Sequence, residues 1–180
     1  MKIRFALVLA AMILGAAAPA ASAYGRPHGY AVTYPVASSL CARVAAGHAP
    51  KRLAADATQI TATCTTLANS YNQALGTYET AVAPIPGQVK STLASVRAAR
   101  QTARQTHDWA AYEAAIKLAN STLQGLRDQV RAAQQVYVAA IRSARQTFWT
   151  TIHALSGAGS LPVDTGTPAP PTAPIVPTSA

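Results

Sequence analysis

Acidic side chains are scarce in this 180-residue chain, which has six Asp and Glu against 15 Lys and Arg. The six are Asp56, Glu79, Asp108, Glu113, Asp128 and Asp164. Acid–base catalysis by paired carboxylates needs two acids brought together. Five of these acids are scattered along stretches with helical periodicity, and the sixth lies in a proline-rich tail. No HExxH, GxSxG or phosphate-cradling glycine loop occurs. The sequence therefore predicts a protein that is not an enzyme.

Histidine and cysteine are equally few. The four histidines are His28, His48, His107 and His153, and no two of them stand four residues apart. The chain has two cysteines and no Cys-x-x-Cys motif. Structural zinc sites need four such ligands at characteristic spacings, so the sequence predicts no metal site and no cofactor. A haem or metal carrier that combines a histidine with a tyrosine from another helix stays open as an alternative.

The chain begins with the features of an export signal. Residues 1–4 form a short basic segment, residues 5–18 form an apolar run, and residues 21–23 (Ala-Ser-Ala) form a small-residue cleavage site. We expect cleavage after Ala23 and a mature protein outside the cytoplasm, periplasmic or secreted. The apolar run is short for a membrane span and no second candidate follows, so we expect no transmembrane segment after cleavage. Residues 24–35 contain glycine, proline and tyrosine without periodicity and predict an irregular arm.

The rest of the chain, up to residue 156, is organised by apolar residues spaced alternately three and four apart, the pattern of amphipathic helices. The longest such seam runs through Trp109, Tyr112, Ile116, Ala119, Leu123, Leu126, Val130, Ala133 and Tyr137, and continues through Ile141, Phe148, Ile152 and Leu155. It predicts one helix over 108–155, roughly 70 Å long at 1.5 Å per residue. The same pattern predicts helices over 36–46, 51–82 and 88–106. The fold class is therefore all-α, an elongated antiparallel helical bundle over 36–156 with three main helices and a short N-terminal helix.

Breaks between the helices follow from proline, glycine and capping residues. Gly47 and Pro50 end the short helix, and two prolines and a glycine in 83–87 predict a reversal. Asp108 or Thr106 is a suitable N-cap for the long helix. A helix that continues through 106–108 is an alternative. Gly125 is a weaker break, and the apolar seam keeps its phase across it.

Two cysteines in an exported protein predict a disulfide. Cys64 lies on the apolar seam of the second helix, and Cys41 lies in the short helix. A Cys41–Cys64 bridge would hold the short helix against the buried side of the second. Closing a loop of this length is worth about 3 kcal/mol in the chain-entropy treatment.

After the long helix the composition changes to Pro, Thr, Ala and Gly. Such a segment lacks the apolar side chains to form a core of its own. The sequence therefore predicts a disordered tail over 157–180.

Basic residues are arranged in two stripes. Removal of Lys2 and Arg4 with the signal leaves 13 basic residues against six acids, a formal charge of +7. At 100° per residue, one stripe spans about 80° on the third helix and the other about 60° on the long helix. They consist of Lys90, Arg97, Arg100 and Arg104, and of Arg127, Arg131, Arg142 and Arg145. Such stripes suit an anionic polymer or simply keep the surface solvated.

The second and third helices, laid side by side, are too short to cover the long one. Its apolar end, Ile141, Phe148, Trp149 and Ile152, needs the short helix, a second copy of the chain or a partner protein as cover. We favour cover by the short helix.

These features predict an exported, non-enzymatic helical protein that binds an envelope partner or an anionic polymer. A haem or metal carrier and a structural protein without a small ligand are the alternatives. Nucleic acid is disfavoured, because no aromatic residues interleave with the arginines.

Overall fold

The computed structural model describes residues 35–155, 161–164 and 166–180. The chain divides into two units, Met1–Tyr30 and Ala31–Ala180, and all described residues belong to the second. The predicted export signal and the arm up to residue 34 lie outside them. The elements are α1 (Pro35–Ala45), the 3₁₀ helix η1 (Lys51–Asp56), α2 (Ala57–Val82), α3 (Ile85–Thr106) and α4 (Trp109–Ala154). The described ranges contain helices and no strands, which confirms the predicted all-α class.

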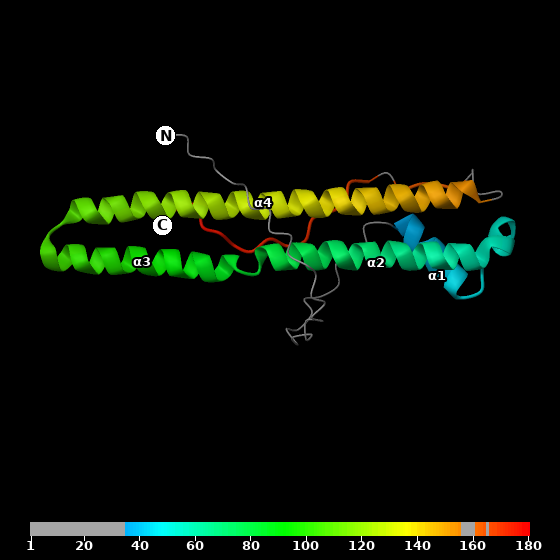
Figure 1. Ribbon diagram of the computed structural model, residues 1–180, viewed down its shortest axis with the longest axis horizontal. Coiled ribbons are helices and arrows are strands. Elements are labelled where there is room, and N and C mark those ends of the chain that lie inside the picture. The colour runs from blue at the N-terminus through cyan, green and yellow to red at the C-terminus, as the bar shows by residue number, and fades with distance from the viewer. Residues whose placement is uncertain (1–34, 156–160, 165) are drawn as a thin grey trace, which may run out of the picture. The chain divides into compact units, whose positions relative to one another are not determined.

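The long helix α4 has a helical partner along each of its halves. α2 and α3, of 26 and 22 residues, follow one another along the 46 residues of α4 and run antiparallel to it (Figure 1). Ile85 at the start of α3 packs with Leu123 and Leu126 of α4. Leu67 of α2 packs in one cluster with Phe148 near the end of α4. These contacts bury much of the apolar seam of α4 from Ala119 onward, and such burial supplies most of the stability of a helix.

The chain does not reverse between α2 and α3, so the predicted reversal at 83–87 was wrong. Ala83 and Pro84 keep right-handed helical dihedral angles, and the amide of Ala83 donates to the carbonyl of Glu79 at 2.9 Å. Pro86 and Gly87 lie within the first turn of α3, where a proline lacks only an amide that has no intrahelical partner. α3 therefore continues in the direction of α2 (Figure 1).

The reversal of direction occurs at 107–108, between α3 and α4. His107 has the left-handed φ of 62° that commonly follows a helix C-terminus. The carboxylate of Asp108 accepts a hydrogen bond from the amide of Ala111 at 3.0 Å, which confirms Asp108 as the N-cap. Gly125 lies within an unbroken α4, as its seam predicts.

α1 covers the apolar end of α4. Its buried residues Ala37, Leu40 and Val44 belong to one core cluster with Phe148, Trp149, Ile152 and Leu155 of α4. Cys41 and Cys64 form the predicted disulfide, with Cα atoms 5.8 Å apart. Ile141, Phe148, Trp149 and Ile152 have relative exposures of 0, 2, 5 and 0%. They are therefore core residues of this chain and do not offer an exposed surface to a partner.

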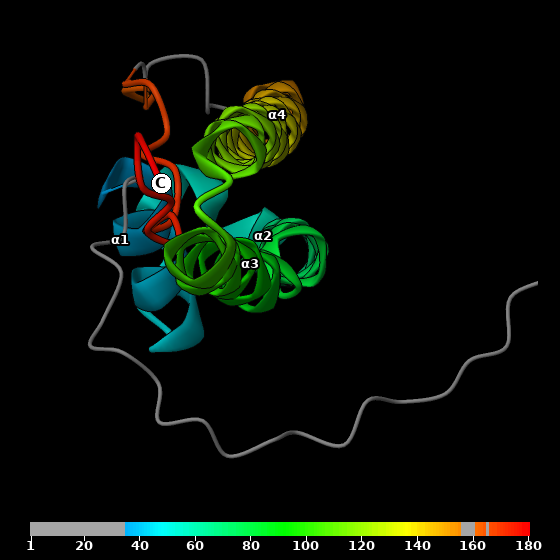
Figure 2. The ribbon, with the colours of Figure 1, turned by 90° about the vertical axis from the view of Figure 1, so that its left-hand side faces the viewer.

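The proline-rich tail differs from the predicted disordered segment. Its residues 161–164 and 166–180 are extended and lie against the helices, on the same side of the α3–α4 pair as α1 (Figure 2). Ala173 and Val176 pack on the cluster of Ile85, Leu123 and Val130. The composition suggested disorder because the tail has no core of its own, but an extended segment can use the apolar surface of helices already formed.

Polar side chains of the helices hold the backbone of the tail. Arg145 of α4 is buried and donates from its two terminal nitrogens to the carbonyls of Gly166 and Asp164, each at 2.7 Å. Further bonds join the helices to tail carbonyls, from Arg127 to Pro177, from Gln134 to Pro171 at 3.4 Å and from Tyr78 to Thr172 at 3.3 Å. An extended proline-rich chain makes few hydrogen bonds within itself. Its carbonyls are therefore available to these donors.

Asp164 of the tail caps α1, which lies 127 and 128 positions away in the sequence. Its two carboxylate oxygens accept from the amides of Ala37 at 3.0 Å and Val36 at 3.1 Å. Amides of a first helical turn have no intrahelical partner, and a carboxylate there also favours the helix dipole.

Substitution of Asp164 by alanine is expected to lower the free energy of unfolding by about 1 kcal/mol, the usual worth of an N-terminal cap. Urea unfolding followed by circular dichroism measures the change. Asp128→Ala is the matched control, because among the described residues Asp128 makes only an exposed ion pair, with Arg131 at 3.3 Å. Equal stability of Asp164→Ala and Asp128→Ala would contradict a capping role for Asp164.

Candidate functional site

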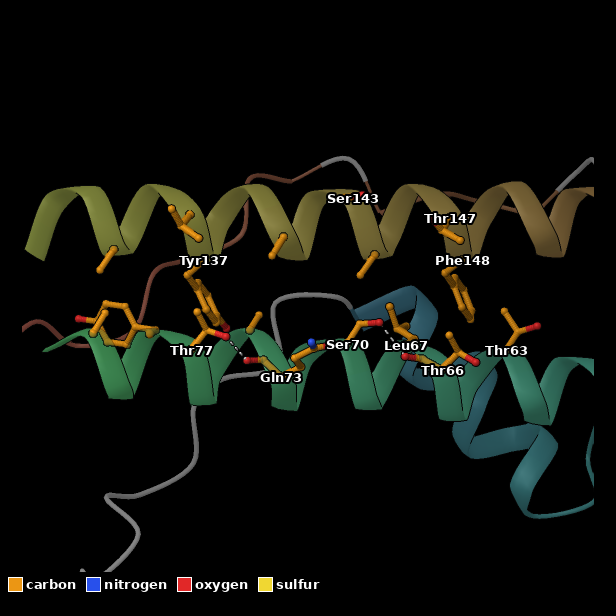
Figure 3. A pocket seen from close by; sticks show the side chains of 17 residues that line it. Thr63, Thr66, Leu67, Ser70, Gln73, Thr77, Tyr137, Ser143, Thr147 and Phe148 are labelled. Atoms are coloured by element: carbon orange, nitrogen blue, oxygen red, sulfur yellow. Dashed lines mark hydrogen bonds between the residues drawn. The ribbon is translucent and has the colours of Figure 1, made fainter. Parts of the chain in front are cut away.

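A groove runs between α2 and α4 and has a volume of about 630 Å³. The α2 side of its lining lies between Thr63 and Ala81, and the α4 side between Ala133 and Phe148. Most of these residues are alanine, serine or threonine, and small side chains on two facing helices leave the hollow between them. Figure 3 shows Tyr137, Phe148 and Leu67 in the space between the two helices.

The hydroxyl groups of the groove are bonded to their own helix. Thr63, Thr66, Ser70 and Thr77 of α2 each donate to the carbonyl four residues earlier, at 2.8 to 3.0 Å. The dashed lines of Figure 3 mark the bonds of Ser70 and Thr77. Because the hydroxyl protons of these four residues are used in this way, the α2 wall offers few donors to a ligand.

Aromatic rings form part of the groove. The rings of Tyr78 and Tyr137 meet edge to face across the two helices, with centroids 6.2 Å apart. Phe148 stands edge to face with Trp149 at 5.0 Å and has one side in the groove. No charged residue is among the 17 described residues that line the groove. The groove is therefore suited to contacts with an uncharged, apolar molecule.

The basic stripe of α3 is exposed along its length. Lys90, Arg97, Arg100 and Arg104 are all exposed, and α3 carries no acidic residue. Within the described residues the ion pair found is Arg131 with Asp128, so none of these four cations has a carboxylate partner there. The stripe predicted from sequence is therefore a continuous positive face of α3.

The basic stripe of α4 is divided between two roles. Arg127 and Arg145 donate to carbonyls of the tail, and Arg145 is 5% exposed, so neither presents a free guanidinium on an open surface. Arg131 pairs with Asp128 and is exposed. Arg142 is exposed and borders a smaller hollow of about 400 Å³ between α4 and the tail. As a set of four, this stripe does not form a single anion-binding face.

Sequence reasoning did not identify the groove or the tail contacts. A signal for the groove was present in Thr66, Ser70, Gln73 and Thr77, which repeat at helical spacing beside the apolar seam of α2. No local signal pairs Arg145 with carbonyls about 20 residues later. Among the helices of the described ranges, none is long and apolar enough to cross a membrane. The same ranges hold no group of three or more His, Cys, Asp or Glu arranged to bind a metal ion.

The chain thus presents an exposed cationic face on α3, an uncharged groove between α2 and α4, and a tail bonded to the helices. The first was expected from the sequence, whereas the other two follow from the packing. Comparison with protein families, with curated proteins and with solved structures finds no significant match to this chain.

Proposed function

We propose that this protein is an exported, non-enzymatic binding module that attaches to an anionic component of the cell envelope through the positive face of α3. The observation that carries this proposal is the alignment of Lys90, Arg97, Arg100 and Arg104 on one exposed side of a helix without an acid. Arginine suits phosphate and carboxylate partners, because its planar group donates several parallel hydrogen bonds.

The remaining features agree with this role. The Cys41–Cys64 disulfide is typical of proteins that fold outside the cytoplasm. Asp108 and Asp164 cap helices and Asp128 pairs with Arg131, so three of the six acids have structural contacts. This use of the few carboxylates supports binding over acid–base catalysis.

The variant Arg97→Gln/Arg104→Gln tests the proposal. Each basic residue near an anionic surface contributes about 1 kcal/mol, so loss of two is expected to weaken binding roughly 30-fold at low salt. Binding of the purified protein to lipoteichoic acid, lipopolysaccharide and heparin is measured by titration at two salt concentrations. Affinity for at least one of them is expected to fall as salt rises, because salt screens exposed charges.

Arg43→Gln/Lys51→Gln is the matched control, since it removes two exposed cations from α1 and η1 and has the same net charge. It is expected to retain most of the affinity. An equal loss of affinity in both variants would show that net charge, and not the face of α3, determines binding, which contradicts the proposal. An absence of binding to all three polyanions would also reject it.

A further inference from the structure

The groove between α2 and α4 is separate from the positive face of α3 and has the opposite character. Its lining contains no Lys, Arg, Asp, Glu or His, and the four α2 hydroxyls described above donate to their own backbone. A charged ligand would therefore lose its hydration in the groove without gaining a partner of opposite charge. An uncharged apolar ligand gains from burial against the alanine methyl groups and the aromatic rings.

The dimensions of the groove accommodate one extended chain. The lining covers 15 helical steps of α4 and 18 of α2, so the groove is about 22 to 27 Å long. Division of its volume of 630 Å³ by this length gives a mean cross-section of about 23 to 29 Å². One acyl chain spans half of the hydrocarbon core of a bilayer, about 15 Å, and fits within the length.

We propose that the α2–α4 groove binds one extended acyl chain of a single-chain amphiphile such as a long-chain fatty acid. The absence of charge in the lining matches the absence of charge along the chain, and the methylene groups lie against Val136, Tyr137 and Ala140. The polar headgroup stays in water, because the groove is open along its side. Val136, which is 59% exposed at the edge of the groove, becomes covered by the chain.

Fluorescence of cis-parinaric acid, a fatty acid that emits strongly in apolar surroundings, tests this assignment on the purified protein. Emission is expected to rise on binding and to fall when palmitic acid or palmityl alcohol is added, since both present the same chain. Butyric acid is expected not to compete, because binding increases with each buried methylene group. Competition by butyric acid, or by palmitic acid and not by its alcohol, would assign binding to the carboxylate and overturn the proposal.

Ala140→Trp is the test of position. Ala140 is exposed and lines the groove, so an indole there occupies the space of several methylene groups and is expected to weaken binding about tenfold or more. Ala139→Trp is the control, because Ala139 is exposed on the same helix and does not line the groove. Equal affinity of the two variants would place the fatty acid elsewhere and reject the proposal.

A second pair of variants adds a charge to the groove without adding bulk across it. Thr77→Lys places an ammonium in the lining, whereas Thr61→Lys places one on the opposite side of α2, and both threonines are exposed and bonded to the carbonyl four residues earlier. Only Thr77→Lys is expected to weaken binding of palmityl alcohol.

If light scattering instead shows a dimer that Ala140→Trp dissociates, the groove is an interface between copies of the chain and the proposal fails. The proposal is independent of the α3 face, since Arg97 and Arg104 do not line the groove.

Discussion

Replacement of Arg145 by methionine is expected to release the tail from the helices and to lower the free energy of unfolding by about 3 kcal/mol. Arg145 is buried and makes two bonds of 2.7 Å to the carbonyls of Asp164 and Gly166. A hydrogen bond from a charged donor contributes about 1.5 to 3 kcal/mol. Methionine keeps most of the apolar length of the side chain, so the loss reports mainly these two bonds and the cap on α1 that depends on Asp164.

Urea unfolding measures the stability of this variant, and limited proteolysis with mass spectrometry measures release of the tail. Residues 166–180 are expected to be cleaved from Arg145→Met under conditions in which the wild-type tail is protected. Arg142→Met is the control, because Arg142 is exposed one turn earlier on α4 and makes no described bond to the tail. A tail that stays protected in Arg145→Met would show that its apolar contacts alone hold it in place.

Loss of the Cys41–Cys64 disulfide is the second large change, expected to lower stability by about 3 kcal/mol through the greater freedom of the unfolded chain. For a protein of this size such a loss lowers the melting temperature by about 10 °C. The double variant Cys41→Ser/Cys64→Ser also weakens the attachment of α1, which covers Phe148 and Trp149. Emission from Trp149 is therefore expected to shift to longer wavelength at temperatures below the main transition.

The measurement is made in a Trp109→Phe background, because Trp109 is 48% exposed and would add its own emission. A reducing agent is expected to destabilise the wild-type protein by the same amount and to leave the double variant unchanged. If the double variant keeps its melting temperature, the packing of Leu40 and Val44 would be sufficient to hold α1 without the bridge.

Local patterns predicted most of the helical part of this fold. The three-and-four spacing from Trp109 to Leu155 placed α4 to within one residue at each end, because a periodic seam of that length has no other regular interpretation. Asp108 and Thr106 were the two N-cap candidates from the sequence, and the hydrogen bond from the amide of Ala111 identifies Asp108. The disulfide was predicted from two cysteines in a chain that begins like an export signal, with Cys64 on an apolar seam, and the structure contains it.

The joint at 83–87 shows where local reasoning failed. Two prolines and a glycine break a helix in its interior, but in a first turn they are compatible with one. Pro86 could stand in the interior of a helix or in its first turn. Which of the two occurs depends on where α3, the second helix that packs on α4, begins. With α3 following α2 in tandem, the two shorter helices cover both halves of α4.

One of the two candidate sites was predictable from the sequence and the other was not. The positive face of α3 was predictable, since exposed residues on one helix need only the helical repeat to bring them together. The groove required knowledge of which face of α2 meets which face of α4, and a seam rich in alanine specifies that less sharply than one with large side chains.

The sequence by itself determined the number of long helices, the disulfide and the alignment of the α3 cations, because each depends on residue type or on a strict period. It left open whether the helix breaks at 106–108, and the structure places the corner there. Only the tertiary structure showed that the tail lies against the helices. Its prolines carry no periodic signal, and its order comes from donors such as Arg145 and apolar side chains such as Leu123 on helices formed by other parts of the chain.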